Sequence, residues 1–155
     1  MSLNRDPLIE SSANWRGPEM LRRTDWIHQV SESEAAEIRD ALKRAQARGV
    51  GLADISRENF VLPKFGEALA HSLQLLEDGP GLSILRGLPV EGLSKDDMRL
   101  MYFGFGRYLG TPVSQSSGGD LLGDVRDFGS DIAAPNGRGY KSRQQLSYHT
   151  DSCDV

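Results

Sequence analysis

Residues 145–155 read Gln-Leu-Ser-Tyr-His-Thr-Asp-Ser-Cys-Asp-Val, and we predict that they form an extended segment. In a strand, residues i and i+2 point to the same face and lie about 6.6 Å apart, so His149 and Asp151 can share one metal ion. An imidazole and a carboxylate are two of the three ligands of a 2-His-1-carboxylate site, which holds Fe(II) and leaves positions open for a co-substrate and O2. His149 and Asp151 are therefore candidate metal ligands.

The same pair has a structural alternative, because His-x-Asp is a short pattern that often arises by chance. In that alternative, His149 is hydrogen-bonded to Asp151 and neither residue binds a metal. The other histidines, His28 and His71, are poor third ligands because they are expected on an irregular arm and on a helix. Cys153 continues the alternation, but nearby carboxylates favour a neutral thiol over a thiolate ligand. The sequence contains no phosphate-binding loop, dinucleotide fingerprint or serine-hydrolase elbow.

The composition favours one globular, soluble domain. The chain has 155 residues, of which 38% are hydrophobic, and this length is ample for a core. With 18 Lys and Arg against 22 Asp and Glu, the net charge of −4 gives no electrostatic reason to expect nucleic acid or an anionic membrane as a partner. A single cysteine and the lack of a signal-peptide or membrane-span pattern indicate a cytoplasmic protein.

Helical periodicity predicts three helices, over residues 31–48, 63–77 and 95–109. Ser31 and Ser94 are suitable capping residues, and Pro63 is typical of a first helical turn. The residues expected to face the core are Ile38, Leu42 and Ala45 in the first helix, Leu62, Phe65, Leu69, Leu73 and Leu76 in the second, and Met98, Met101, Tyr102, Phe105, Tyr108 and Leu109 in the third. His71 lies off these stripes and is expected to be exposed.

The remaining segments are predicted to be irregular or extended. Residues 1–30 are expected to form an irregular arm anchored by the packing of Trp15 and Trp26. A strand entering the core is predicted over residues 81–86. Two further strands are predicted, one at 112–115, before a glycine-rich loop over 116–144, and one at 121–125, within that loop.

Several stretches occur in a recognisable order along the chain. After Trp15 and Trp26 come Phe-Val-Leu-Pro at 60–63, Gly-Leu-Ser-Ile-Leu-Arg-Gly-Leu-Pro-Val at 81–90, Phe-Gly-Arg-Tyr-Leu-Gly-Thr-Pro-Val at 105–113, Leu-Leu-Gly-Asp-Val-Arg-Asp at 121–127 and Tyr-His-Thr-Asp-Ser-Cys-Asp at 148–154. In this order they resemble the N-terminal half of the taurine dioxygenase-like family, which are Fe(II)- and 2-oxoglutarate-dependent oxygenases. The resemblance covers nearly the whole chain.

The resemblance implies an α+β fold, with N-terminal helices packed on the first strands of a double-stranded β-helix, or jelly roll. It implies a single domain over residues 1–155 that is the N-terminal portion of such a jelly roll, truncated before the rest. Within it, the arm occupies 1–30, helices with a core strand occupy 31–110, and strands with a long loop occupy 111–155 and end in His-x-Asp.

The resemblance also implies an active site. His149 and Asp151 would be the first two iron ligands, with Fe(II), 2-oxoglutarate and O2 as cofactor and co-substrates. Gln145 and Gln115 match positions that line the substrate pocket, and loop hydrogen bonding is an equal alternative for both. The third iron ligand and the arginine that binds 2-oxoglutarate lie downstream in the family and are absent from this chain.

The implied reaction is hydroxylation of a small organic substrate, with decarboxylation of 2-oxoglutarate to succinate. The expected partner is that small molecule, not nucleic acid or a membrane, and a homo-oligomer is left open. One alternative is a truncated, non-catalytic remnant that acts by binding or interaction. A second alternative is a cupin-like protein that uses another divalent ion.

Overall fold

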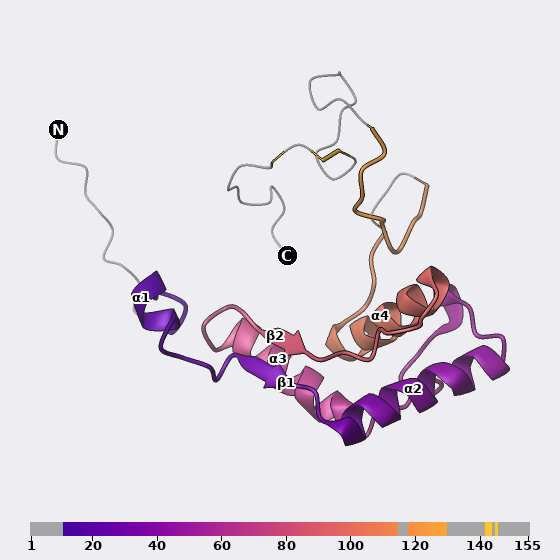
Figure 1. The fold of residues 1–155 in the computed structure, drawn as a ribbon, viewed down its shortest axis with the longest axis horizontal. Coiled ribbons are helices and arrows are strands. Elements are labelled where there is room, and N and C mark those ends of the chain that lie inside the picture. Colours follow the sequence, from indigo (N-terminus) through magenta and orange to yellow (C-terminus); the bar gives the residue numbers. More distant parts are fainter. Residues whose placement is uncertain (1–10, 115–117, 130–141, 144, 146–155) are drawn as a thin grey trace. The chain divides into compact units, whose positions relative to one another are not determined.

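The computed structural model describes residues 11–114, 118–129, 142–143 and 145. The chain divides into two compact units, Met1–Val113 and Ser114–Val155. The helices and strands found among the described residues all belong to the first unit (Figure 1). They are α1 (Gly17–Met20), β1 (Ile27–Gln29), α2 (Glu32–Ala47), the short 3-10 helix η1 (Leu52–Asp54), α3 (Phe65–Glu77), β2 (Ile84–Arg86) and α4 (Lys95–Leu109). The architecture is α+β, as predicted.

Helix α2 begins at the predicted capping box. The Ser31 hydroxyl accepts a hydrogen bond from the Glu34 backbone N–H at 3.3 Å, and the Glu34 carboxylate accepts one from the Ser31 backbone N–H at 2.7 Å. Two of the donors that a helix N-terminus leaves unpaired are thereby satisfied. The expected core positions Ile38, Leu42 and Ala45 are all buried, so this helix and its buried face are confirmed.

Helix α3 begins at Phe65, two residues later than Pro63 led us to predict. Its cap comes from another helix, because the Glu37 carboxylate of α2 accepts hydrogen bonds from the backbone N–H groups of Lys64, at 3.1 Å, and Phe65, at 2.8 Å. A carboxylate at this position also interacts favourably with the positive end of the helix dipole. The start of α3 is thus set by a tertiary contact that local sequence does not reveal.

The buried face of α3 differs from prediction toward the end of the helix. Phe65 and Leu69 are buried as expected, but Leu76 is 46% exposed. Ala68 and Ser72 are buried instead. The Ser72 hydroxyl accepts a hydrogen bond from that of Ser83 at 3.0 Å, which joins α3 to the segment before β2. His71 is exposed, as predicted.

Helix α4 has the predicted ends but a different buried face. Ser94 and Asp97 form a capping box, and Gly110 follows the last residue of the helix. The predicted stripe is wrong at three positions, since Met98, Tyr102 and Leu109 are exposed. The buried residues are Leu100, Met101, Phe103, Gly104 and Phe105. Helix α4 contacts α2, α3 and η1, so the buried side of the helix is broad and centred on Gly104. Met98, Tyr102 and Leu109 lie on the opposite side and are exposed.

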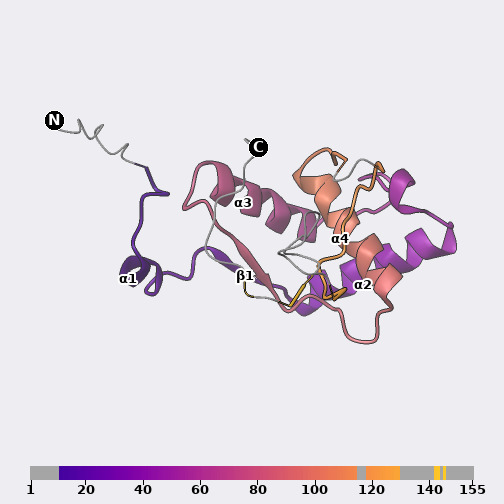
Figure 2. The ribbon, with the colours of Figure 1, turned by 90° about the horizontal axis from the view of Figure 1, so that it is seen from above.

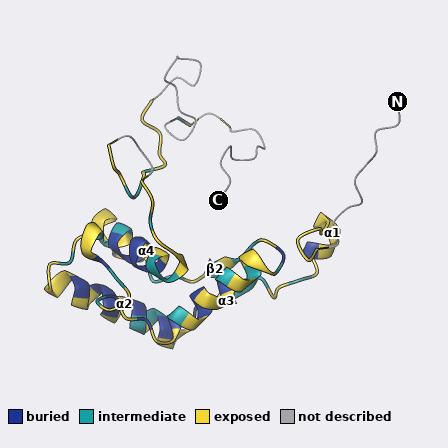
Figure 3. Ribbon diagram, turned by 180° about the vertical axis from the view of Figure 1, so that it is seen from behind, coloured by how far each residue is buried: buried dark blue, intermediate teal, exposed yellow. Residues whose placement is uncertain are grey.

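The core lies among α2, α3 and α4, which Figures 1 and 2 show grouped together. Three phenylalanines meet there. The Phe105 ring lies 5.0 Å from that of Phe65 and 6.4 Å from that of Phe60, between ring centres, at the tilted and edge-on angles that aromatic pairs prefer. Figure 3 shows the buried residues of the three helices on the sides that face this core.

The two strands form a parallel pair, with Ile27 opposite Ile84 and Gln29 opposite Arg86. The prediction of an irregular arm over 1–30 is therefore wrong at β1 and at the short helix α1. The strand predicted over 81–86 is also shorter than expected and half exposed, because Ile84 is 40% exposed and lies on the open face of the pair. Only the other face, which carries His28, packs toward the helices, with the His28 ring 6.3 Å from that of Phe65.

The strands predicted at 112–115 and 121–125 are not found. Residues 112–114 and 121–125 are in no strand, and Gln115 lies outside the described residues. Short apolar runs do not by themselves specify a strand, and Gly123 interrupts the second run. In the part of the chain that the structure describes, no helix is both long enough and apolar enough to cross a membrane.

The close packing of Phe60 against α4 predicts that alanine substitutions at two glycines of that helix change the stability of the protein in opposite directions. A Cβ at Gly104 would come within 2.7 Å of the Phe60 ring, whereas a Cβ at Gly106 would meet nothing within 4 Å. We expect Gly104→Ala to lower the free energy of unfolding by about 1–3 kcal/mol. We expect Gly106→Ala to raise it by about 0.5–1 kcal/mol, since alanine suits a helix interior better than glycine does. Urea unfolding measures both, and equal stability of the two variants would contradict this packing.

Candidate functional site

Most residues of the predicted active site lie outside the described part of the chain. His149, Asp151, Gln115 and Cys153 are among the residues that the structure does not describe, so their roles stay predictions. Gln145 is described, and its side chain is exposed. Among the described residues, no group of three or more His, Cys, Asp or Glu side chains could hold a metal ion.

In the second unit, an ion pair, a hydrogen bond and a cation–π contact connect described residues that precede Gln145 in the sequence. The Asp127 carboxylate lies 3.8 Å from the Arg143 guanidinium and accepts a hydrogen bond from the Gly129 backbone N–H at 2.8 Å. The Arg126 guanidinium lies 4.4 Å above the centre of the Phe128 ring. Arg143 is almost fully exposed, and exposed ion pairs contribute little, so these contacts orient the segment without anchoring it strongly.

His28 connects the sheet to the start of α2. Its Nε2 atom lies 3.0 Å from Oε1 of Glu34, and that carboxylate also accepts a hydrogen bond from the Ser31 hydroxyl at 2.8 Å. Glu34 is buried, which by itself would raise its pKa, but the hydrogen bonds from Ser31 and the interaction with His28 together hold its pKa below the ordinary value. The imidazole thus makes a structural contact from β1, not from an irregular arm, and its exclusion as a third metal ligand stays a prediction.

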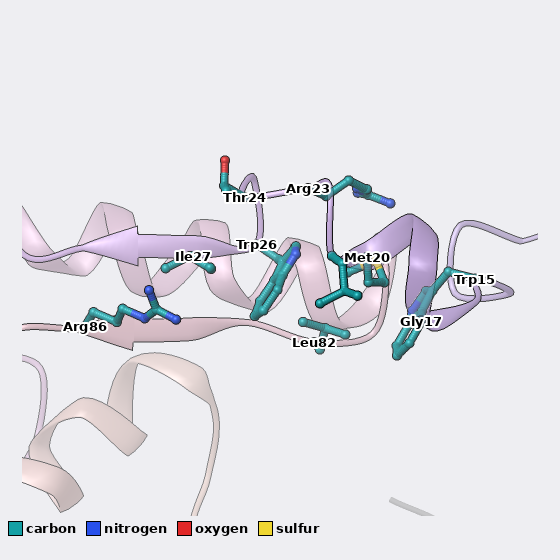
Figure 4. Close-up of a pocket in the computed structure, with 10 residues that line it drawn as sticks. Trp15, Gly17, Met20, Arg23, Thr24, Trp26, Ile27, Leu82 and Arg86 are labelled. Atoms are coloured by element: carbon teal, nitrogen blue, oxygen red, sulfur yellow. The ribbon is translucent and has the colours of Figure 1, made fainter.

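A cavity of about 590 Å³ lies between the N-terminal arm and β2. Trp15, Met20, Trp26 and Leu82 form much of its wall, and Arg86 lies at its β2 end (Figure 4). Packing was predicted for both tryptophans, but Trp26 is only partly buried and Trp15 is 37% exposed, although the Trp15 indole N–H donates a hydrogen bond to the Pro80 carbonyl at 2.8 Å. The cavity itself was not predicted, because its walls come from segments more than fifty residues apart in the sequence.

The chain matches no protein-family profile. It is 31% identical, over 142 residues, to FR-33289 synthase of Streptomyces rubellomurinus, a match that covers 91% of this chain and 42% of that protein. It is 26% identical, over 144 residues, to a taurine hydroxylase-like protein of Stachybotrys chartarum, covering 88% of this chain and 37% of that protein. The resemblance to the taurine dioxygenase-like family is confirmed.

The similarity to taurine dioxygenase-like proteins involves both units of the chain. The first unit ends at Val113, so a match of 142 residues necessarily extends into the second unit, which carries the His-x-Asp pair. The chain spans less than half the length of the curated relatives that it matches.

The lowered pKa of Glu34 predicts an acid-labile contribution to stability. A carboxyl whose pKa is lower in the folded than in the unfolded protein stabilises the fold at pH values above its unfolded pKa, which is near 4.5 for Glu34. This stabilisation is lost as the pH falls through the pKa of the folded state. At pH 7 we expect Glu34→Gln to lower the free energy of unfolding by about 1 kcal/mol, because glutamine retains the capping hydrogen bonds but not the charge.

The difference in free energy of unfolding between wild type and Glu34→Gln should become smaller as the pH falls below 4.5. Denaturant unfolding at a series of pH values measures this difference. Glu32→Gln is the matched control, because Glu32 lies in the same helical turn and is exposed. A pH-independent difference between Glu34→Gln and wild type would contradict the assignment of the effect to charge.

Proposed function

We propose that the protein carrying this chain is an Fe(II)- and 2-oxoglutarate-dependent dioxygenase that hydroxylates a small organic substrate. The similarity to FR-33289 synthase and to a taurine hydroxylase-like protein, which extends into the unit carrying His149 and Asp151, is the observation that supports this function. On this proposal, helices α2, α3 and α4 pack on the first strands of a jelly-roll domain.

The chemistry of the two proposed ligands fits ferrous iron. A neutral imidazole nitrogen and a carboxylate oxygen are the donors of facial sites that hold Fe(II) and leave other positions open. His149 and Asp151 would hold the metal from one face of the extended segment, and both side chains must be deprotonated to do so. When bound, the iron and 2-oxoglutarate supply O2 activation coupled to decarboxylation to succinate.

The two glutamines are proposed to orient the substrate. A glutamine amide offers both hydrogen-bond donors and an acceptor, so Gln145 and Gln115 can position a polar group of the substrate beside the metal ligands. The exposed side chain of Gln145 is available for such a contact. The third iron ligand and the 2-oxoglutarate-binding arginine are not assigned to residues of this chain.

The proposal predicts that the purified intact protein releases succinate from 2-oxoglutarate only when Fe(II) is present. His149→Ala should reduce this turnover to background, because one of two proposed ligands from this chain is lost. The matched control is His71→Ala, which removes an exposed histidine of α3 and should leave turnover unchanged. Succinate formation measures the turnover of both variants. Undiminished turnover by His149→Ala would contradict the assignment of His149 as an iron ligand.

The same preparation distinguishes the two alternatives. A non-catalytic remnant would bind no Fe(II) and consume no 2-oxoglutarate under any condition. A cupin-like protein would retain a divalent metal on elemental analysis, lose it in His149→Ala, and still consume no 2-oxoglutarate.

A further inference from the structure

The cavity between the arm and β2 has the size and surface of a small-molecule site. Its volume of about 590 Å³ lies within the range of about 300–1,000 Å³ that such sites usually have. Trp15 and Trp26 approach it from the arm, and Met20 and Leu82 contribute aliphatic surface (Figure 4). These walls suit an apolar body with a flat or flexible shape.

The charged groups of the cavity are of one sign. Two arginines line it, and no aspartate or glutamate does. Arg23 is already neutralised, because its guanidinium makes hydrogen bonds of 3.0 and 2.6 Å to the Asp25 carboxylate. Among the described residues, Arg86 has no ion-pair partner. At the β2 end of this mainly apolar cavity, the Arg86 guanidinium is therefore available to pair with an anionic group of a ligand.

The backbone holds Arg86 in place at that end. The Arg86 carbonyl accepts hydrogen bonds from the Val30 N–H at 2.8 Å and from the Gln29 side chain at 3.3 Å. Alternate residues of a strand share a face, so Arg86 lies on the same face of β2 as the half-exposed Ile84. In Figure 4 the Arg86 side chain extends along β2 toward Trp26.

We propose that this cavity binds a small amphipathic carboxylate, with its apolar body against Trp15 and Trp26 and its carboxylate on Arg86. A guanidinium presents two parallel N–H donors that match the two oxygens of a carboxylate, which selects this head group over a neutral one. None of the residues that line the cavity is a proposed metal ligand, so the two proposals can be tested separately.

The test uses isothermal titration calorimetry on the purified intact protein, without iron or 2-oxoglutarate. Phenylbutyrate is the probe, and phenylbutanol, which has the same apolar body without the charge, is its neutral partner. We expect phenylbutyrate to bind more tightly than phenylbutanol. We expect Arg86→Gln to weaken phenylbutyrate binding by about fivefold, the effect of a partly exposed ion pair, and to leave phenylbutanol binding unchanged.

A second variant tests the cavity itself. Gly17 lines the cavity, and a Cβ at this position would meet nothing within 4 Å, so Gly17→Leu places a side chain in open space without backbone strain. It should weaken the binding of both probes, with circular dichroism and thermal unfolding as checks on the fold.

Two control variants separate this site from other possibilities. Arg39→Gln removes an exposed arginine of α2 that does not line the cavity, and it should change neither affinity. His149→Ala should bind phenylbutyrate as the wild type does, so failure of the iron proposal would not affect this result. Equal affinity for both probes, or phenylbutyrate binding that survives Arg86→Gln and Gly17→Leu unchanged, would overturn the proposal.

Discussion

The Phe60 ring lies directly against the backbone of α4 at Gly104, where any Cβ would collide with it. This close approach lets the segment before α3 enter the core and brings Phe60 to Phe105. Tyr108 strengthens the same contact, since its hydroxyl donates a hydrogen bond to the Phe60 carbonyl at 3.0 Å and accepts one from the Leu62 N–H at 2.8 Å. The packing of α3 on α4 therefore depends on the absence of a side chain at Gly104 and on the partly buried hydroxyl of Tyr108.

Contacts between distant segments complete the first unit. Glu37 of α2 caps α3, and His28 of β1 pairs with Glu34 at the start of α2. Arg57 donates hydrogen bonds to the carbonyls of Arg107 and Tyr108, which are among those that the end of α4 leaves unpaired. In each case a side chain from one element satisfies backbone or buried groups of another, so the helix ends and the tertiary structure stabilise each other.

The three long helices α2, α3 and α4 could be predicted from the sequence, but their buried faces could be predicted only in part, and the short helices α1 and η1 were missed. Capping at Ser31 and Ser94 is local, since the pairing residue lies three positions away, and both starts are confirmed. The predicted buried face of α4 was wrong at Tyr102. Apolar residues occur all round this helix, so amphipathic periodicity does not show which side faces the core. The strand β1 was missed because a three-residue strand has too little periodicity to detect and depends on its partner.

By itself, the sequence determined the α+β class, the helix starts at Ser31 and Ser94, and the similarity to taurine dioxygenase-like proteins, since these rest on local patterns and their order. The metal-ligand roles of His149 and Asp151 stay predictions that rest on the sequence alone. Only the tertiary structure decided the pairing of β1 with β2, the cap on α3 and the cavity between Trp26 and Arg86. These features join segments that are far apart in the chain, and no local pattern records which distant residues will meet.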